Sequence, residues 1–182
     1  MRLCVATYFV LCGCLYAQQP VSSVSMTDDQ ILSALSGIQQ HETRLEPMLA
    51  ELKPKDWIRK GAADTYEEQF NSVTNQLHAI ETDMTNLTQH PSQMSDCIKA
   101  LFRAQAFHEM LGSLLGGVRR YQNPALADLI EAVAAEDRAD LDRLENWVLQ
   151  LAGEKEAQFN VVDREAQRCR ATLSSEPAVR RK

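Results

Sequence analysis

The sequence predicts an all-α protein, an up-and-down antiparallel bundle of about four helices with a long C-terminal helix. Three observations predict it. Ala, Leu, Glu and Gln, which favour helices, dominate the 182 residues, whereas Gly (7), Pro (6) and aromatic residues (6%) are few. Apolar residues recur at steps of three and four along long stretches. Short segments that contain proline separate these stretches, and short turns between amphipathic helices favour antiparallel neighbours.

The first 17 residues have the layout of a secretory signal peptide. Arg2 is the only charged residue before Asp28, and the apolar stretch 3–17 is shorter than the roughly 20 residues of a membrane span. A positive start, a short apolar centre and a small final residue are typical of export signals. We therefore expect an exported chain, periplasmic or secreted, and no later stretch is apolar enough to span a membrane.

Two processing routes follow from the end of this stretch. Cleavage after Ala17 places a small residue at the cut, although Leu15 is bulky for its position. The segment LCGC at 11–14 is similar to a bacterial lipobox, in which Cys14 would carry the lipid, although Cys12 is unusual there. We favour simple cleavage, with a lipid anchor on Cys14 as the alternative.

The rest of the chain divides into a flexible lead (18–26), a helical bundle domain (27–175) and a basic tail (176–182). Loss of Arg2 with the signal changes the net charge from −6 to −7. An acidic chain argues against nucleic acid, whose binding depends on Lys and Arg at phosphates. About 160 mature residues suit one domain with a hydrophobic core.

The first helix is expected to begin at Thr27 or Asp28, either of which can cap it. Pro47 removes a backbone donor, so a kink or break is expected near 44–46. Glu42 fills one gap in a stripe of apolar residues, which are Ile31, Leu35, Ile38, Leu45, Leu49 and Leu52.

One helical turn at Pro54–Arg59 and a stop at Gly61 lead to the second long helix. Its stripe has no gap and comprises Tyr66, Phe70, Val73, Leu77, Ile80, Met84 and Leu87. Pro91 suits the first position of the third helix. That helix carries His108 within a stripe formed by Met94, Cys97, Leu101, Ala104, Leu111, Leu115 and Val118.

The last helix is expected over 124–173, with Asn123 as its cap and Pro124 at its first position. Its apolar positions are Leu126, Ile130, Val133, Leu141, Leu144, Val148, Leu151, Phe159 and Val162. About fifty helical residues span about 75 Å, more than the other helices. The end of this helix must therefore project, bend back at Gly153, or pair with a second molecule.

Ligand patterns for a metal or haem are missing from the sequence. Di-iron bundles use Glu-x-x-His pairs, but no carboxylate stands three residues before His41, His78, His90 or His108. A c-type haem needs Cys-x-x-Cys-His, and no phosphate loop, Gly-x-Ser-x-Gly or His-Glu-x-x-His motif occurs. We expect no catalytic, cofactor-binding or metal-binding residues and no cofactor.

The remaining polar and aromatic features are expected to be structural. His108 should be partly buried and hydrogen-bonded to a neighbouring helix, and Trp57 and Trp147 should pack in the core or at its boundary. With Arg138 and Arg143 interleaved, a solvated, salt-bridged face should form from the acidic run Asp128, Glu131, Glu136, Asp137, Asp140, Asp142 and Glu145.

Cys97 and Cys169 are the pair left by cleavage after Ala17. On straight antiparallel helices they would be offset by roughly 36 Å, whereas a disulfide needs Cα atoms within about 7 Å. We therefore expect no intramolecular disulfide, with Cys169 either free or linking two chains.

These features favour an exported, non-enzymatic protein that binds other proteins, as an envelope scaffold, a chaperone-like clamp or an oligomerisation module. A protein partner is expected, and the C-terminal helix is a candidate for self-association. The alternative is a small-ligand carrier or enzyme with a pocket inside the bundle. A large apolar cavity near His108 would favour that alternative, whereas a filled core with an exposed apolar stripe would favour protein binding.

Overall fold

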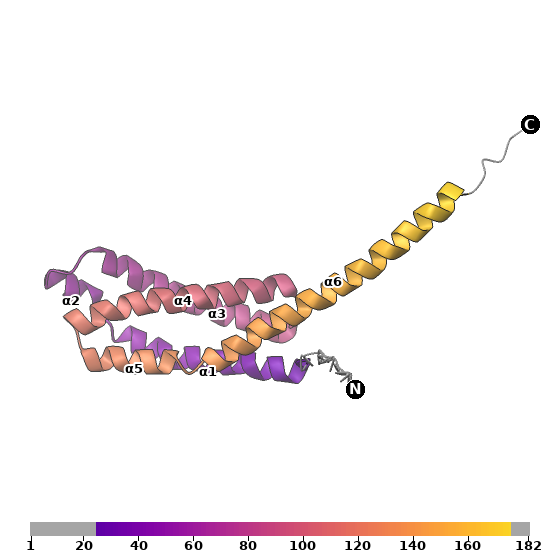
Figure 1. Cartoon of the computed structure of the whole chain (residues 1–182). Helices are drawn as coiled ribbons and strands as arrows, with labels where there is room; N and C mark the ends of the chain where they lie inside the picture. Colours follow the sequence, from indigo (N-terminus) through magenta and orange to yellow (C-terminus); the bar gives the residue numbers. More distant parts are fainter. Residues whose placement is uncertain (1–24, 176–182) are drawn as a thin grey trace, which may run out of the picture.

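The computed structural model describes residues 25–175, whose regular structure is helical throughout. The helices are α1 (Asp28–Ala50), α2 (Pro54–Arg59), α3 (Thr65–Gln89), α4 (Met94–Tyr121), α5 (Pro124–Ala134) and α6 (Arg138–Ser175). Helices α1, α3 and α4 alternate in direction, and α5 with the start of α6 forms the fourth member of the bundle (Figure 1). The predicted antiparallel helical bundle with a long C-terminal helix is therefore confirmed.

Three of the predicted segments fall largely on residues that the structure does not describe. The signal peptide at 1–17, with Cys14, lies outside the described residues, as does the basic tail at 176–182. Of the predicted lead at 18–26, the structure describes the last two residues. Within 25–175, no helix combines the length and apolar character that crossing a bilayer requires.

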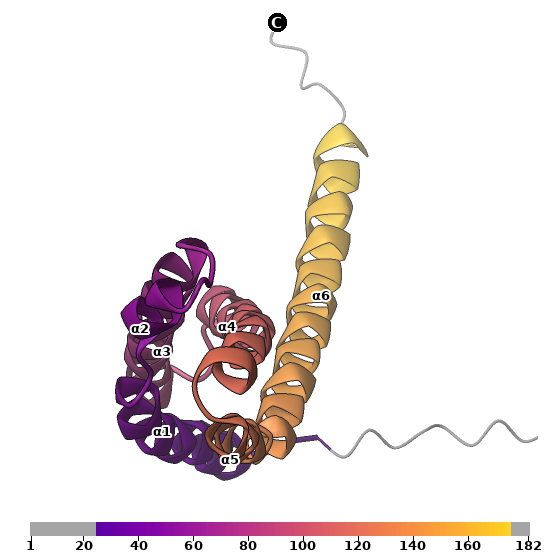
Figure 2. The ribbon, with the colours of Figure 1, turned by 90° about the vertical axis from the view of Figure 1, so that its left-hand side faces the viewer.

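The bundle is filled by the predicted apolar stripes. Seen end-on, α1, α3, α4 and α5 surround a common centre, with α6 against α1 and α4 (Figure 2). The α3 stripe is buried from Val73 to Leu87, and the two tryptophans lie in the same core. Trp57 donates to Gln122 Oε1 over 2.9 Å, and Trp147 donates to Pro91 O over 2.6 Å. The prediction that both tryptophans pack in the core is confirmed.

The helix ends follow local chemistry that is readable in the sequence. Thr27 caps α1 by accepting from the Gln30 backbone, and the Gln30 side chain accepts from Thr27 N over 2.9 Å. Gly61, with φ of +92°, follows α2 in a conformation that disfavours other residues. Asn123 caps α5 through Ala125 N over 3.0 Å, with proline in the first turn as predicted.

Two predicted effects of prolines differ in the structure. Of the kink or break expected near 44–46, the break is absent, because Pro47 lies in the last turn of α1 and the buried Leu45 and Leu49 on either side hold the helix to the core, while the kink stays a prediction. Pro91 does not open the third helix, since α4 begins at Met94 and Pro91 lies in the preceding turn. The Pro91 carbonyl instead accepts hydrogen bonds from the Trp147 ring and the Cys97 thiol.

The last predicted helix is also divided, since residues 135–137 form a turn between α5 and α6. Asp137 occupies a core-facing position four residues after Val133 and stands directly before α6, where its carbonyl accepts the first helical hydrogen bonds. The start of α6 lies close to α1, since a Cβ at Gly37 would meet the side-chain carboxylate of Asp140. A polar residue inside the apolar stripe is therefore where the helix is interrupted.

Helix α6 has two halves, which we call the inner half (138–152) and the outer half (153–175). The inner half packs against α1 and α4, and its core residues are Leu144, Trp147 and Leu151. The outer half continues through Gly153 without a break and projects beyond the end of the bundle (Figure 1). Of the three outcomes expected for the overlong helix, the structure has the projection.

Cys97 and Cys169, the two cysteines among the described residues, are not bonded to each other, and a link between two chains through Cys169 stays a prediction. Cys97 is buried in α4, and burial raises the pKa of its thiol to about 11. Cys169 is exposed on the outer half of α6.

Candidate functional site

Polar residues from four parts of the chain lie in the middle of the bundle, and three of them are buried. Glu42 from α1, Asp83 from α3 and Asp137 from the α5–α6 turn are 3%, 8% and 5% exposed, and we call them, with His108 from α4, the polar layer. In α1, in α4 and between α5 and α6, a polar residue of the layer takes one position of the apolar stripe. Buried charges are costly unless they are paired, so their partners decide what the layer can do.

Two of these carboxylates have cationic or imidazole partners. Asp137 Oδ2 lies 2.9 Å from His108 Nε2. Asp83 is paired with Lys99 Nζ at 3.3 Å and Arg103 Nε at 3.0 Å. His108 is partly buried as predicted, but its partner Asp137 lies in the turn between α5 and α6 rather than in a neighbouring helix.

Glu42 has the most perturbed carboxyl of the layer. Its Oε2 is buried without a hydrogen-bond partner, as is the second carboxylate oxygen of Asp137. Burial, and then the negative charges of Glu81, Asp137 and Asp83, raise the pKa of Glu42 to about 9. Glu42 is therefore protonated and neutral at pH 7, which lowers the cost of enclosing it among other acids.

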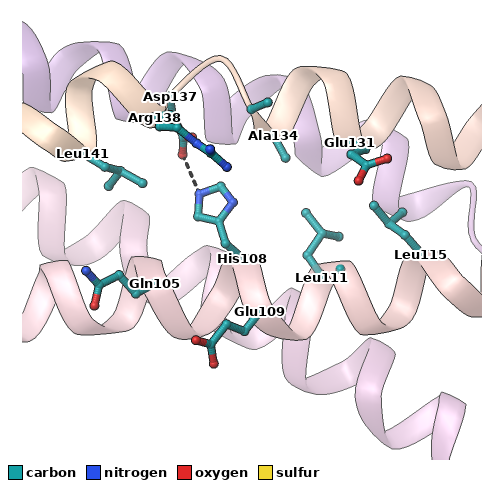
Figure 3. A pocket seen from close by; sticks show the side chains of 12 residues that line it. Gln105, His108, Glu109, Leu111, Leu115, Glu131, Ala134, Asp137, Arg138 and Leu141 are labelled. Atoms are coloured by element: carbon teal, nitrogen blue, oxygen red, sulfur yellow. Dashed lines mark hydrogen bonds and ion pairs between the residues drawn. The ribbon is translucent and has the colours of Figure 1, made fainter.

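A hollow of about 420 Å³ lies beside this layer, between α4 and the α5–α6 turn. Figure 3 shows His108 reaching from α4 toward Asp137, while Glu109 points away from the pair. The lining comprises Gln105, His108, Glu109, Leu111, Gly112, Leu115, Glu131, Ala134, Ala135, Asp137, Arg138 and Leu141. It includes no hydroxyl or thiol side chain, so the lining offers the His108–Asp137 pair no protein nucleophile of these kinds.

Within residues 25–175, no group of three or more His, Cys, Asp or Glu side chains is arranged to hold a metal ion. The histidines outside the layer have other surroundings. His78 is half exposed near Glu46, His90 is the C-cap of α3, and His41 of α1 lies 3.7 Å from Glu136.

The predicted acidic face is correct in part. Asp128 and Glu131 are exposed and pair with Arg119 of α4, and Arg143 pairs with Asp140 at 2.5 Å. Asp137 is not solvated, because it is buried against His108, and the side chain of Asp140 is only 14% exposed. Asp137 takes the stripe position between Val133 and Leu141, so its place in the apolar spacing, rather than its place in the acidic run, indicates that it is buried.

The outer half of α6 is the second candidate site. Nearly all of its described side chains are exposed. They include an apolar series at steps of three and four, which we call the outer stripe and which comprises Phe159, Val162, Ala166, Cys169 and Leu173. Phe159, Val162 and Leu173 are 70%, 63% and 72% exposed. Contiguous apolar surface of this kind is typical of a binding surface.

Comparisons of the chain with protein-family models, with curated proteins and with solved structures found no match.

Sequence reasoning missed the polar layer, although the sequence carries a sign of it. Glu42, His108 and Asp137 each interrupt an otherwise apolar stripe. One polar residue in a stripe is unremarkable, and the spacing within one helix does not tell which interruptions meet. Asp83 gave no sign, because it stands beside the α3 stripe rather than in it.

Proposed function

We propose that this is an exported, non-enzymatic protein that acts by binding another protein chain along the outer stripe of α6. The bundle serves as the base that holds this helix out from its end. An envelope scaffold, a chaperone-like clamp and an oligomerisation module all need such an arm. Export rests on the layout of residues 1–17, and it is tested by the mass of the chain's N-terminal peptide after secretion.

The exposed outer stripe is the observation that carries the proposal. Its apolar residues have the spacing of a helix that packs against another helix, but the described part of the bundle leaves them uncovered. Helices in proteins gain most of their stability by packing an apolar face. A helix that extends over twenty residues beyond its own bundle therefore gains stability from a partner that covers this face.

Val161 and Val162 provide a matched test of the stripe. Both are exposed valines of the outer half, but about 100° separates neighbouring residues around a helix, so Val161 points away from the stripe. Val162→Asp should abolish capture of the partner from the envelope of the source cell, whereas Val161→Asp should leave capture unchanged. Equal capture by both variants would refute binding through the stripe.

The hollow beside His108 supports a second candidate, a carrier of a small polar ligand. Its lining is mixed, with charged groups such as Glu131 and Arg138 beside Leu111 and Leu115. It is a surface hollow rather than the large apolar cavity that would favour a carrier or enzyme. His108→Ala would weaken binding of such a ligand and leave Val162-dependent capture intact.

A further inference from the structure

The direction in which the outer stripe faces restricts the partner. At about 100° per residue, the outer stripe lies on the same side of α6 as the buried inner residues Leu141, Leu144, Val148 and Leu151. The stripe thus continues the face that packs into the bundle, with Lys155 as the interruption between the two sets. A partner helix on the outer stripe therefore lies on the side of α6 that faces the bundle, beyond the bundle's end.

The end of the bundle sets how far the partner can extend. Trp147 donates to the turn carbonyl of Pro91, and Gln150 exchanges hydrogen bonds with the Met26 backbone at 2.7 and 3.3 Å. These contacts place the bundle's end near residue 151 of α6. A partner helix therefore meets α6 beyond this residue, along the outer half.

This geometry excludes a parallel pair of two identical α6 helices. In a parallel pair, the partner's inner half would lie against the packed face of the first inner half. Helices α1 and α4 already occupy that space. In an antiparallel pair, the partner's bundle lies beyond the free end of the helix, where it meets no obstacle in residues 25–175.

The charges beside the stripe are self-complementary in the antiparallel arrangement. Asp163 and Arg170 lie on the same flank of the outer stripe, and same-flank positions face each other when two helices run antiparallel. Asp163 of each copy then faces Arg170 of the other when Ala166 packs opposite Cys169. If the register shifts by one heptad toward the bundle, Asp163 instead faces Asp163 of the other copy, and Glu165 faces Glu165.

We infer that the partner is a second copy of this chain, with the two outer halves paired antiparallel in the register that sets Ala166 against Cys169. This inference rests on the proposed function, because it names the partner that covers the outer stripe. Val162 then packs opposite Leu173 in each half of a two-fold symmetric interface. The assembly is a dumbbell with one bundle at each end.

Charge reversal at the two flanking positions tests the inference in the full chain. Asp163→Arg places Arg opposite Arg170 twice, and Arg170→Asp places Asp opposite Asp163 twice. Each single variant should raise the dimer dissociation constant roughly tenfold, since two attractive pairs become repulsive. A one-to-one mixture of the two variants restores both attractive pairs, so it should form mixed dimers with the wild-type dissociation constant. Sedimentation velocity measures all four samples.

Three results would overturn the inference. If Asp163→Arg has the wild-type dissociation constant while Arg170→Asp dimerises more weakly, the helices pair in parallel, because Arg170 then faces Glu165. If neither variant nor their mixture differs from wild type in its dissociation constant, the dimer interface lies elsewhere on the chain. If the wild type is a monomer at every attainable concentration, the partner is not a second copy. Capture of a different protein that depends on Val162 would then leave the proposed function standing. If that capture is also absent, both the inference and the proposed function are refuted.

Discussion

The inner and outer halves of α6 carry the same kind of apolar stripe on the same side of one helix, but their surroundings differ. In the inner half, α1 and α4 cover the stripe, and Leu144 is completely buried. In the outer half, Leu173 is 72% exposed. Periodicity therefore shows which residues are suited to burial and leaves open which chain covers them. Substitutions in the two halves separate the stabilisation that the bundle gives from the binding that we propose for the outer stripe.

The largest expected difference is between aspartate at a covered and at an uncovered leucine of α6. Leu144→Asp puts an unpaired charge into the core and should lower the free energy of unfolding by about 4 kcal/mol or more. Leu173→Asp should change the free energy of unfolding of the dilute monomer by less than about 0.5 kcal/mol. Chemical denaturation followed by circular dichroism measures both. Similar losses for the two variants would mean that the outer half belongs to the folded core.

The next largest expected effect is in the polar layer, where a substitution should raise the free energy of unfolding. Glu42→Gln removes a carboxyl whose pKa is about 9 in the fold against 4.5 in the unfolded chain. At pH 7 the unfolded wild type gains by ionising, so the variant should be more stable by about 3 kcal/mol. Glu156→Gln, on the exposed outer half, is the matched control and should change stability by less than about 0.5 kcal/mol.

The same carboxyl predicts a pH dependence. Because the pKa of Glu42 is raised by folding, its favourable contribution is complete below pH 4.5 and is lost as pH rises toward 9. The stability advantage of Glu42→Gln should therefore grow across this window and be absent near pH 4. An advantage that does not vary with pH would contradict a buried, neutral Glu42.

The smallest effect concerns the contact at which the covered half of α6 ends. Trp147→Phe keeps an aromatic ring in the core and removes the hydrogen bond to the Pro91 carbonyl, which should cost about 1 kcal/mol. The matched change Phe159→Leu in the outer half should leave monomer stability unchanged. Thermal unfolding at low protein concentration distinguishes the two variants. An unchanged melting temperature for Trp147→Phe would mean that the bundle does not end at this contact.

The comparison also shows how much of the fold was predictable. The spacing of apolar residues and the helix caps were sufficient to predict α3, the single turn of α2 and the start of α5, because these features depend on residues close in sequence. The continuity of α1 through Pro47 and the turn before α6 depend on packing between distant helices. The polar layer was hidden for the same reason, since Glu42 and Asp137 come together only in the folded bundle.

The account's central claim is that the bundle holds the inner half of α6 while a second chain holds the outer half. Hydrogen exchange, resolved by peptide at a concentration where the chain associates, tests this most directly in wild type, Val161→Asp and Val162→Asp. The account predicts that residues 141–151 are equally protected in all three, and that 156–175 lose protection in Val162→Asp alone. Protection of 156–175 that is the same in all three chains would contradict it.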